Sequence, residues 1–217
     1  MTTESGARVP RRAATRRAEI LEAARALFNA HGTAAVSTNR IAAAAGVSPG
    51  NLYYWFPDKP AVIRALFEDW SGVSMPPAPE SGNPAAALRA LFASVAAQPS
   101  VSGRFAFFSR ELVALLHADP GLAEAYRHNY EVKTRRIEAG ILTLIAAGLL
   151  HDPTGHVELR DAVVSAWITS ESAPAFLELV EPQAGPERSR AVATAVLRAL
   201  LTDEGERALR ETGAGHA

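Results

Sequence analysis

The side chains with the clearest chemistry lie between Ser48 and Lys59, where an amide, two phenols and an ammonium group follow one another. Asn51 carries a short amide, which can read the edge of an adenine base. Tyr53 and Tyr54 carry hydroxyls that can bond to phosphate or pack on sugar, and the ammonium group of Lys59 can pair with phosphate. These residue types, so closely spaced, favour recognition of a nucleic acid.

Such side chains need a helix whose N-terminus points outward, and the local sequence predicts one. Ser48 is a strong N-cap, and Pro49 suits the first helical position because its missing N–H would be unpaired there. Gly50 has no side chain, so the backbone there can approach a duplex closely. Pro57 ends the helix, and Asp58 caps the next one. The segment is therefore typical of the second helix of a helix-turn-helix, which enters the major groove.

A shorter helix precedes it and completes the motif. Ser37 or Thr38 can cap this helix, and Gly46 follows it where a left-handed backbone is required. Leu52 and Phe56 are four residues apart in the second helix, so they face the same way and are assigned to the core. An aromatic run of this kind is also typical of an ordinary helical core. The ordered sequence of cap, glycine turn, proline start and lysine favours the helix-turn-helix.

The stretch from about Arg16 to Trp70 resembles the DNA-binding domain of the TetR family of bacterial transcriptional regulators. The matching segments are ILEAARALFNAHG, TNRIAAAAGVSPGNLYYWFPDK and VIRALF. The resemblance implies an all-helical homodimer, usually a repressor, which leaves its operator when a small ligand binds to the larger C-terminal domain. It also implies double-stranded operator DNA, a small-molecule effector and a second copy of the chain as partners.

The resemblance assigns roles to single residues. Thr38, Tyr54 and Lys59 match positions that usually contact phosphate, and the recognition-helix positions usually facing the groove match Ser48, Gly50, Asn51 and Tyr53. The predicted DNA-binding set is Thr38, Arg40, Ser48, Gly50, Asn51, Tyr53, Tyr54 and Lys59. Two residues depart from the family pattern: Trp55 replaces a common histidine, and Pro60 replaces an acidic residue. The first departure bears on one phosphate contact, and the second only on the start of the following helix.

Composition agrees with this interpretation and excludes several other classes of site. The 217 residues are 48% apolar and contain no cysteine, which excludes disulfides and thiolate chemistry. No apolar run is long enough to span a membrane, and the first residues lack a secretory signal, so a cytoplasmic location is expected. His151 and His156 flank a loop without a further ligand beside them, and neither a metal site nor a cofactor is predicted.

The charge is unevenly distributed along the chain. Eight basic and four acidic residues lie in residues 1–60, which gives this part a charge of +4 and leaves −5 for the rest. A basic end on an acidic remainder suits a protein that meets a polyanion at one end. Four arginines lie before or at the start of the first helix: Arg11, Arg12, Arg16 and Arg17. Two roles remain open for them, either contact with the minor groove and phosphates or simple solubilisation.

The whole sequence predicts helices and no strands. The expected fold class is all-α, with an N-terminal three-helix helix-turn-helix domain followed by a larger helical ligand-binding and dimerisation domain. The expected divisions are a flexible basic arm (1–14), the DNA-binding domain (15–70), a hinge rich in proline and glycine (71–83) and the helical domain (84–217). Pro174 should kink or split the helix expected over 157–180.

The last two long helices, expected over 157–180 and 187–201, carry broad aliphatic stripes. These stripes can pack on their own subunit's core, or they can pair with a symmetry mate as a four-helix bundle. The resemblance favours homodimerisation through these two helices. Two DNA-binding domains are also required mechanically, because half-sites lie about one helical turn apart, roughly 34–36 Å.

The ligand site is predicted where aromatic and charged residues share helices. The predicted set is Arg104, Phe107, Phe108, Glu111, Tyr126, Tyr130 and Trp167. Its apolar character indicates a hydrophobic or aromatic ligand, although core aromatics and surface Arg–Glu pairs are an equally ordinary origin of the pattern. Alternative functions are an all-helical enzyme or a protein-binding adaptor with an incidental helix-turn-helix, and no catalytic motif supports the enzyme.

Overall fold

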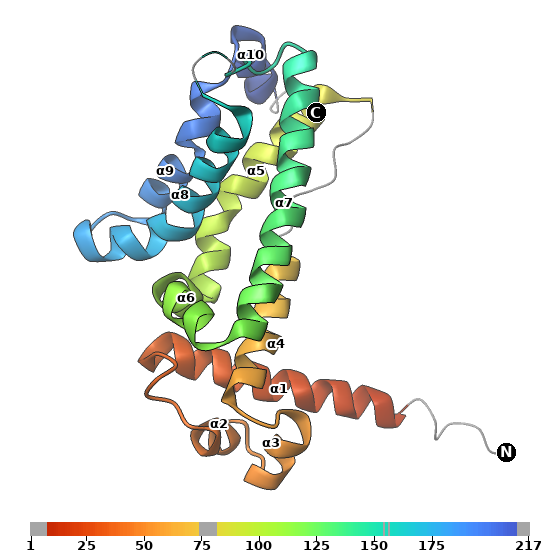
Figure 1. The fold of residues 1–217 in the computed structure, drawn as a ribbon, viewed down its shortest axis with the longest axis vertical. Coiled ribbons are helices and arrows are strands. Elements are labelled where there is room, and N and C mark those ends of the chain that lie inside the picture. Colours follow the sequence, from red (N-terminus) through yellow and green to blue (C-terminus); the bar gives the residue numbers. More distant parts are fainter. Residues whose placement is uncertain (1–7, 74–81, 154, 156, 212–217) are drawn as a thin grey trace, which may run out of the picture.

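A computed structural model describes residues 8–73, 82–153, 155 and 157–211 of the chain (Figure 1). Its helices there are α1 (Arg8–His31), α2 (Thr38–Ala44), α3 (Pro49–Trp55), α4 (Lys59–Val73), α5 (Pro84–Arg104), α6 (Ala106–Ala118), α7 (Pro120–Ala146), α8 (Leu159–Val180), α9 (Pro186–Ala199) and α10 (Asp203–Arg210). No strand forms in these ranges beyond one isolated bridge, between Leu150 and Leu201. The predicted all-α class is confirmed.

Helices α1 to α4 form one end of the molecule, which we call the head (Figure 1). The head closes around fully buried residues of all four helices, among them Phe28, Ile41, Leu52 and Leu66. Phe56 is also buried, so the predicted core positions in the second helix of the motif are confirmed. Apolar burial of this kind is what holds such short helices, because α2 and α3 are too short to be stable alone.

Helices α5 to α10 form the remainder, which we call the body. A second core lies between α5, α7, α8 and α9 and includes Leu88, Ile141, Leu144 and Leu197. Figure 1 shows α7 as the long helix along one side, with α8 and α9 on the other and α5 between them. The body therefore encloses its own apolar interior, which makes it suited to hold an internal cavity.

Helix α10 closes the end of the body farthest from the head, and the sequence did not predict it. Gly205 lies so close to the Leu149 carbonyl oxygen that a Cβ atom there would approach it to 2.1 Å. Thr202 caps the helix by accepting from the Gly205 backbone N–H at 3.0 Å, and it donates to the Gly148 carbonyl at 2.7 Å. The contact between glycine and carbonyl is a tertiary feature that helical periodicity does not reveal.

Two helices of the head, α1 and α4, have boundaries that differ from the expected ones. Helix α1 begins at Arg8, although a flexible arm was expected through residue 14. The alanines and arginines of this stretch are good helix formers, and Pro10 is tolerated in a first turn. Helix α4 continues past Trp70 to Val73, into the expected hinge over 71–83. Residues 1–7 of the predicted arm and 74–81 of the predicted hinge lie outside the described residues.

Two prolines lie inside helices without ending them. Helix α5 continues through Pro99 to Arg104. Helix α8 contains Pro174 and is continuous, so the expected split does not occur. Each proline removes one backbone hydrogen bond from its helix. Packing of α5, α8 and α9 against one another compensates for that loss. None of the helices in the described ranges is long and apolar enough to cross a bilayer.

Candidate DNA-binding surface and effector site

The caps and the glycine predicted from the sequence are present at the turn between α2 and α3. The Ser37 hydroxyl accepts from the Arg40 backbone N–H, and the Ser48 hydroxyl accepts from the Asn51 backbone N–H, each at 3.2 Å. Gly46 has a φ of 64°, the left-handed conformation that favours glycine. These caps and this turn are confirmed, and they fix the angle at which α3 leaves the head.

The predicted DNA-binding residues of α2 and α3 lie together at the tip of the head. The exposed members are Arg40, Ser48, Gly50, Asn51, Tyr53 and Tyr54. Tyr54 is 79% exposed and Tyr53 is 48% exposed, which is unusual for aromatic side chains. Thr38 is half-buried, and its hydroxyl lies 3.0 Å from that of Tyr53, which links α2 to α3. The tip thus presents an amide, two phenols and a guanidinium group on a rigid support.

Lys59 takes a different orientation from the predicted one. Its Nζ donates to the Thr33 backbone carbonyl at 2.7 Å, and the side chain is half-buried. It therefore ties the start of α4 to the loop that follows α1. The other two protons of the ammonium group have no such constraint from this bond, since lysine carries three donors.

The predicted basic arm is partly tied down within the head. Arg16 forms an ion pair with Glu19 at 2.8 Å, and Arg17 lies over the Phe56 ring with its guanidinium carbon 5.5 Å from the centroid. The side chains of Arg11 and Arg12 lie outside the described residues. Both arginines therefore make contacts within the head and do not behave as parts of a free arm.

Four members of the predicted ligand set lie at the junction of head and body. Phe107 and Phe108 are buried, and their rings pack on aromatic rings of α1 and α4. The ring centroids are 5.3 Å apart for Phe28 and Phe107, and 6.1 Å apart for Phe67 and Phe108. These two phenylalanines fill the core between the two parts and are not among the residues that line the cavity of the body.

Arg104 and Glu111 also serve this junction. The Arg104 backbone carbonyl accepts from Arg25 at 2.7 Å and from Asn29 at 2.9 Å. Glu111 accepts from Thr33 twice, from its backbone N–H at 3.1 Å and from its hydroxyl at 2.5 Å. These contacts join α1 to α5 and α6, and the Arg104 side chain itself lies over the Phe105 ring, with its guanidinium carbon 5.4 Å from the centroid.

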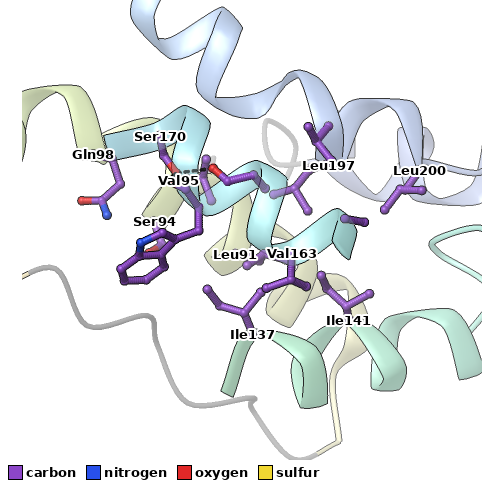
Figure 2. Close-up of a pocket in the computed structure, with 14 residues that line it drawn as sticks. Leu91, Ser94, Val95, Gln98, Ile137, Ile141, Val163, Ser170, Leu197 and Leu200 are labelled. Carbon is purple, nitrogen blue, oxygen red and sulfur yellow. Dashed lines mark hydrogen bonds between the residues drawn. The ribbon is translucent and has the colours of Figure 1, made fainter. Parts of the chain in front are cut away.

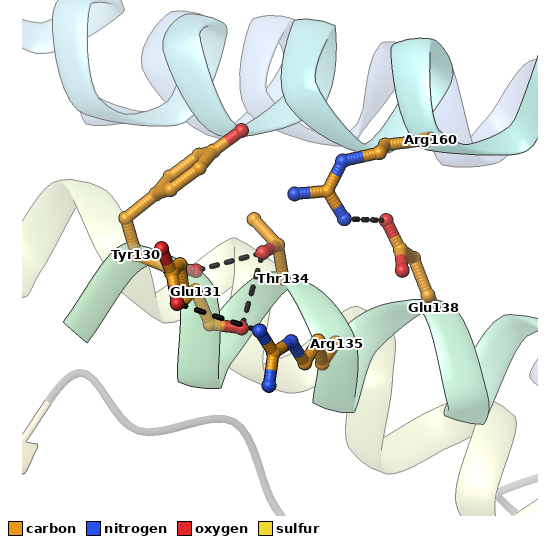
Figure 3. A network of polar contacts seen from close by, with 6 residues as sticks. All are labelled: Tyr130, Glu131, Thr134, Arg135, Glu138 and Arg160. Carbon is orange, nitrogen blue, oxygen red and sulfur yellow. Dashed lines mark hydrogen bonds and ion pairs between the residues drawn. The ribbon is translucent and has the colours of Figure 1, made fainter. Parts of the chain in front are cut away.

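The other three members, Tyr126, Tyr130 and Trp167, gather inside the body. Trp167 Nε1 donates to the Tyr126 hydroxyl at 3.2 Å, and that hydroxyl donates to a carboxylate oxygen of Glu171. Tyr130 meets Trp167 edge-on with ring centroids 5.8 Å apart. Figure 3 shows the Tyr130 ring reaching from α7 toward α8, near the Arg160–Glu138 ion pair (2.8 Å) that joins these helices. These three predicted aromatic residues therefore lie together in one cluster.

Two residues of this cluster, Lys133 and Glu171, were missed. Lys133 is buried, and its Nζ lies 5.1 Å from the ring centroid of Trp70 and 5.8 Å from that of Trp167. Glu171 Oε1 has no hydrogen-bond partner among the described residues. Lys133 is four residues from both Asn129 and Ile137, so helical spacing does place it on the inner face of α7. That spacing was the available signal, but a charged residue is normally assigned to the surface.

Burial shifts the protonation of this cluster. It raises the pKa of Glu171 to about 7, against the opposing effects of the Tyr126 hydroxyl and Lys133. It lowers the pKa of Lys133 to about 8, and the nearby carboxylate of Glu171 limits the shift. Burial, with the charge of Glu171, also raises the pKa of Tyr126. The three groups are thus held together at a cost in desolvation, which a purely structural core would avoid.

Glu171→Gln is expected to make the stability of the fold less dependent on pH. The folded state binds the Glu171 proton more tightly than the unfolded chain, so stability falls as pH rises from 4.5 to about 7. Over that window the wild type should lose on the order of 2–3 kcal/mol relative to the variant, since one pKa unit is worth about 1.4 kcal/mol. Urea unfolding of both proteins at each end of the window measures the difference. The exposed control, Glu124→Gln, should keep the pH dependence of the unfolding free energy that the wild type shows. If Glu171→Gln also kept it, the raised pKa of Glu171 would be contradicted.

A cavity lies between α5, α7, α8 and α9 (Figure 2). Its free volume is about 50 Å³, so a molecule of the size usual for such sites requires the four helices to move apart. Its lining is Leu91, Ser94, Val95, Gln98, Ile137, Ile141, Ala162, Val163, Ala166, Trp167, Ser170, Val196, Leu197 and Leu200. Trp167 belongs to both this lining and the buried cluster. Of the predicted ligand set, the structure therefore brings only Trp167 to the cavity.

Comparison with protein families gives two matches along the chain. The family described as "Bacterial regulatory proteins, tetR family" matches residues 20–66. The family described as "Bacterial transcriptional repressor" matches residues 83–209. The first match covers most of the head, and the second covers most of the body. No curated protein matches the chain significantly.

Solved structures share this fold over most of its length. A TetR-family transcriptional regulator from Marinobacter aquaeolei VT8 has 27% identity and a TM-score of 0.72, over 89% of this chain and 95% of that chain. The fatty acid degradation regulator FadR from Bacillus halodurans has 19% identity and a TM-score of 0.61, over 86% and 95%. The SmeT–triclosan complex has 19% identity and a TM-score of 0.62, over 87% and 93%. These similarities extend across both head and body.

Proposed function

This chain belongs to the TetR family of bacterial transcriptional regulators, and we propose that it is a homodimeric repressor released from its operator by a small apolar ligand. Membership identifies it as a transcription regulator and not an enzyme. The observation that carries the proposal is the exposed N-terminal half of α3, held on the capped turn at the tip of the head. The apolar cavity in the body supplies the second half of the proposal.

In the proposed complex, α3 enters the major groove. Asn51 reads a base edge, and the missing side chain of Gly50 lets the backbone approach the duplex. Phosphate contacts come from Arg40 on α2 and from the exposed Tyr54 hydroxyl on α3. Lys59 contributes mainly by fixing the loop after α1, because its Nζ is bonded to the Thr33 carbonyl.

The proposed dimer forms through α8 and α9. Large apolar side chains of α8 are exposed along one stripe, including Ile168 at 57%, Phe176 at 62% and Leu179 at 82%. Helix α9 exposes the small residues Ala191 and Ala195, which allow a close approach of a neighbouring helix. Monomers rarely leave so large an apolar surface in water. A second copy would cover it in an isologous four-helix contact.

The proposed effector site is the cavity of the body. Its lining is mostly aliphatic, and four helices contribute to it, so a bound molecule can change how those helices pack. One protein of this fold is known as a complex with triclosan, which supports the use of such a body as a binding site for a small molecule.

Two connections lead from the body to the DNA-binding surface. Trp167 of the cavity contacts Tyr126 and Lys133, and both of these contact Trp70 on α4. At the junction, Glu111 holds Thr33, whose carbonyl in turn accepts from Lys59 at the start of α4. We propose that the ligand favours a second packing of these contacts, in which the heads no longer match the operator spacing. It can do so only through different affinities for the two states.

Glu111→Gln is expected to weaken the coupling between effector and operator. The charged acceptor of two Thr33 bonds becomes a neutral amide, and the coupling should fall by about 1 kcal/mol, or roughly fivefold. The readout is the ratio of operator Kd values with and without saturating effector. In the wild type, operator must weaken effector binding by the same factor by which effector weakens operator binding. An unchanged ratio in the variant would remove Glu111 from the connection, and Glu124→Gln is the matched exposed control.

A reporter gene tests the proposed function itself. The duplex that the protein selects in vitro is placed across a promoter, and the protein is produced in the same cell. Repression predicts that reporter expression falls with the wild type and recovers with Asn51→Ala. Unchanged expression would contradict operator binding in the cell, and increased expression would identify an activator.

A further inference from the structure

The cavity of the body changes polarity along its length. Ser94 and Gln98 lie one helical turn apart on α5, and Figure 2 shows them on the same side of the cavity as Ser170 of α8. The opposite side in that view is formed by Ile141, Leu197 and Leu200. A guest that fills the cavity would therefore meet polar groups at one end and aliphatic side chains at the other.

None of the fourteen lining residues carries a charge. A charged guest would lose its hydration without gaining a partner of opposite sign, which costs several kcal/mol in an apolar site. The nearest buried charges, Lys133 and Glu171, lie beyond the Trp167 ring and have opposite signs. Because their charges largely cancel, this pair attracts neither a cation nor an anion. The cavity therefore favours an uncharged molecule.

The polar end can both donate and accept. The Gln98 amide carries two donors and a carbonyl acceptor, and no hydrogen bond joins it to another described side chain. The Ser170 hydroxyl already donates to the Ala166 carbonyl at 2.5 Å, which leaves it as an acceptor. A hydroxyl group suits such a setting, because it too donates and accepts.

We propose that the effector is an uncharged amphiphile, with an alkyl or aryl body at the aliphatic end and a hydroxyl group bonded to the Gln98 amide. This inference rests on the proposed function, since it names the chemical class of the molecule that the cavity takes. Gln98 is then the residue that distinguishes the hydroxylated molecule from its hydrocarbon analogue.

Calorimetric titration of the full-length protein without DNA tests this class directly. The probes are para-butylphenol, para-butyltoluene, para-butylbenzoate and para-butylbenzylammonium, which share one body and differ in the head group. The phenol should bind about tenfold more tightly than the toluene, which is the usual effect of one hydrogen bond in a partly buried site. The benzoate and the benzylammonium should bind more weakly than the phenol by at least the same factor.

Gln98→Met isolates the amide, because it keeps the length of the side chain and removes its hydrogen bonds. The variant should lose the preference for the phenol, and its affinity for the toluene should be unchanged or higher. Gln183→Met is the matched control, since Gln183 is exposed in the loop after α8, and it should behave as the wild type does. Gln98→Leu, which is shorter, repeats the test if the methionine variant does not fold.

Each other outcome overturns the inference in a recognisable way. Tighter binding of either charged probe would overturn the uncharged class, and a phenol preference that survives Gln98→Met would overturn the role of Gln98. Binding of no probe would overturn the amphiphile class as a whole. Operator binding is measured separately on the same samples, so a protein that selects DNA but binds no probe would retain the proposed regulatory function.

Discussion

Phe176→Asp is expected to convert the protein to monomers and to lower its operator affinity by about a hundredfold or more. In an isologous contact the substitution occurs twice, and each copy would bury a carboxylate without a partner. Phe176 is 62% exposed in the single chain, so the change should leave the subunit folded. A monomer keeps one head and loses the gain from binding the second half-site intramolecularly, which is worth roughly 10²–10⁴ in affinity.

Sedimentation velocity and operator titration of the same sample measure the two effects together. Leu142→Asp is the matched control: Leu142 is 56% exposed on α7, outside the two helices of the proposed dimer contact, and its replacement should change neither mass nor affinity. A Phe176→Asp protein that stays dimeric would place the dimer contact elsewhere. A monomer with full operator affinity would contradict the need for two heads.

Asn51→Ala should lower affinity for the operator by about 1–3 kcal/mol per half-site and relax the base preference at one position of each. The side chain is exposed, and its backbone N–H is already capped by Ser48, so removal of the amide should leave α3 in place. The two half-sites together then lose on the order of 2–6 kcal/mol, the largest specific effect expected from any single side chain of the tip.

Titration of operators carrying each base at each position measures this change. Tyr54→Phe is the contrasting variant, because loss of a phosphate contact should weaken binding to all sequences alike. If Asn51→Ala also weakened all sequences equally, Asn51 would be a backbone contact and α3 would lie differently in the groove. If neither substitution had an effect, α3 would not be the recognition helix.

The helix-turn-helix was predictable because the rules that form it are local. The caps of Ser37 and Ser48, the left-handed Gly46 and the cap of Asp58 each act over three or four residues. A sequence shows such signals directly. The buried positions of the second helix followed from helical spacing alone.

The effector site was less predictable because it depends on how distant helices pack. Phe107 and Phe108 belong to the predicted ligand set because of their helical spacing, yet they meet α1 and α4 in the core. Lys133 and Glu171 are residue types normally found at the surface, yet Lys133 lies over two tryptophan rings and Glu171 accepts from the Tyr126 hydroxyl. Nothing in the spacing of Gln98 distinguishes a cavity wall from a surface.

Several helix ends were predicted wrongly for the same reason, the packing of helices that are distant in the sequence. Pro174 was expected to kink or split its helix, and Pro99 lies inside α5; in both helices packing against neighbouring helices outweighs the one hydrogen bond that the proline removes. Helix α10 depends on the contact of Gly205 with the Leu149 carbonyl, which lies far away in the sequence. Local propensity is a weak guide wherever tertiary contacts decide.

Selection of bound duplexes from a random DNA library, followed by a salt titration of the preferred duplex, tests the central claim most directly. A homodimer that reads the major groove through α3 should select a palindrome whose half-sites lie about one helical turn apart, and its affinity should fall steeply with salt. The purified protein is unfolded and refolded beforehand to remove any bound ligand. Enrichment of such a palindrome is the predicted result, and a library without enrichment would contradict the account.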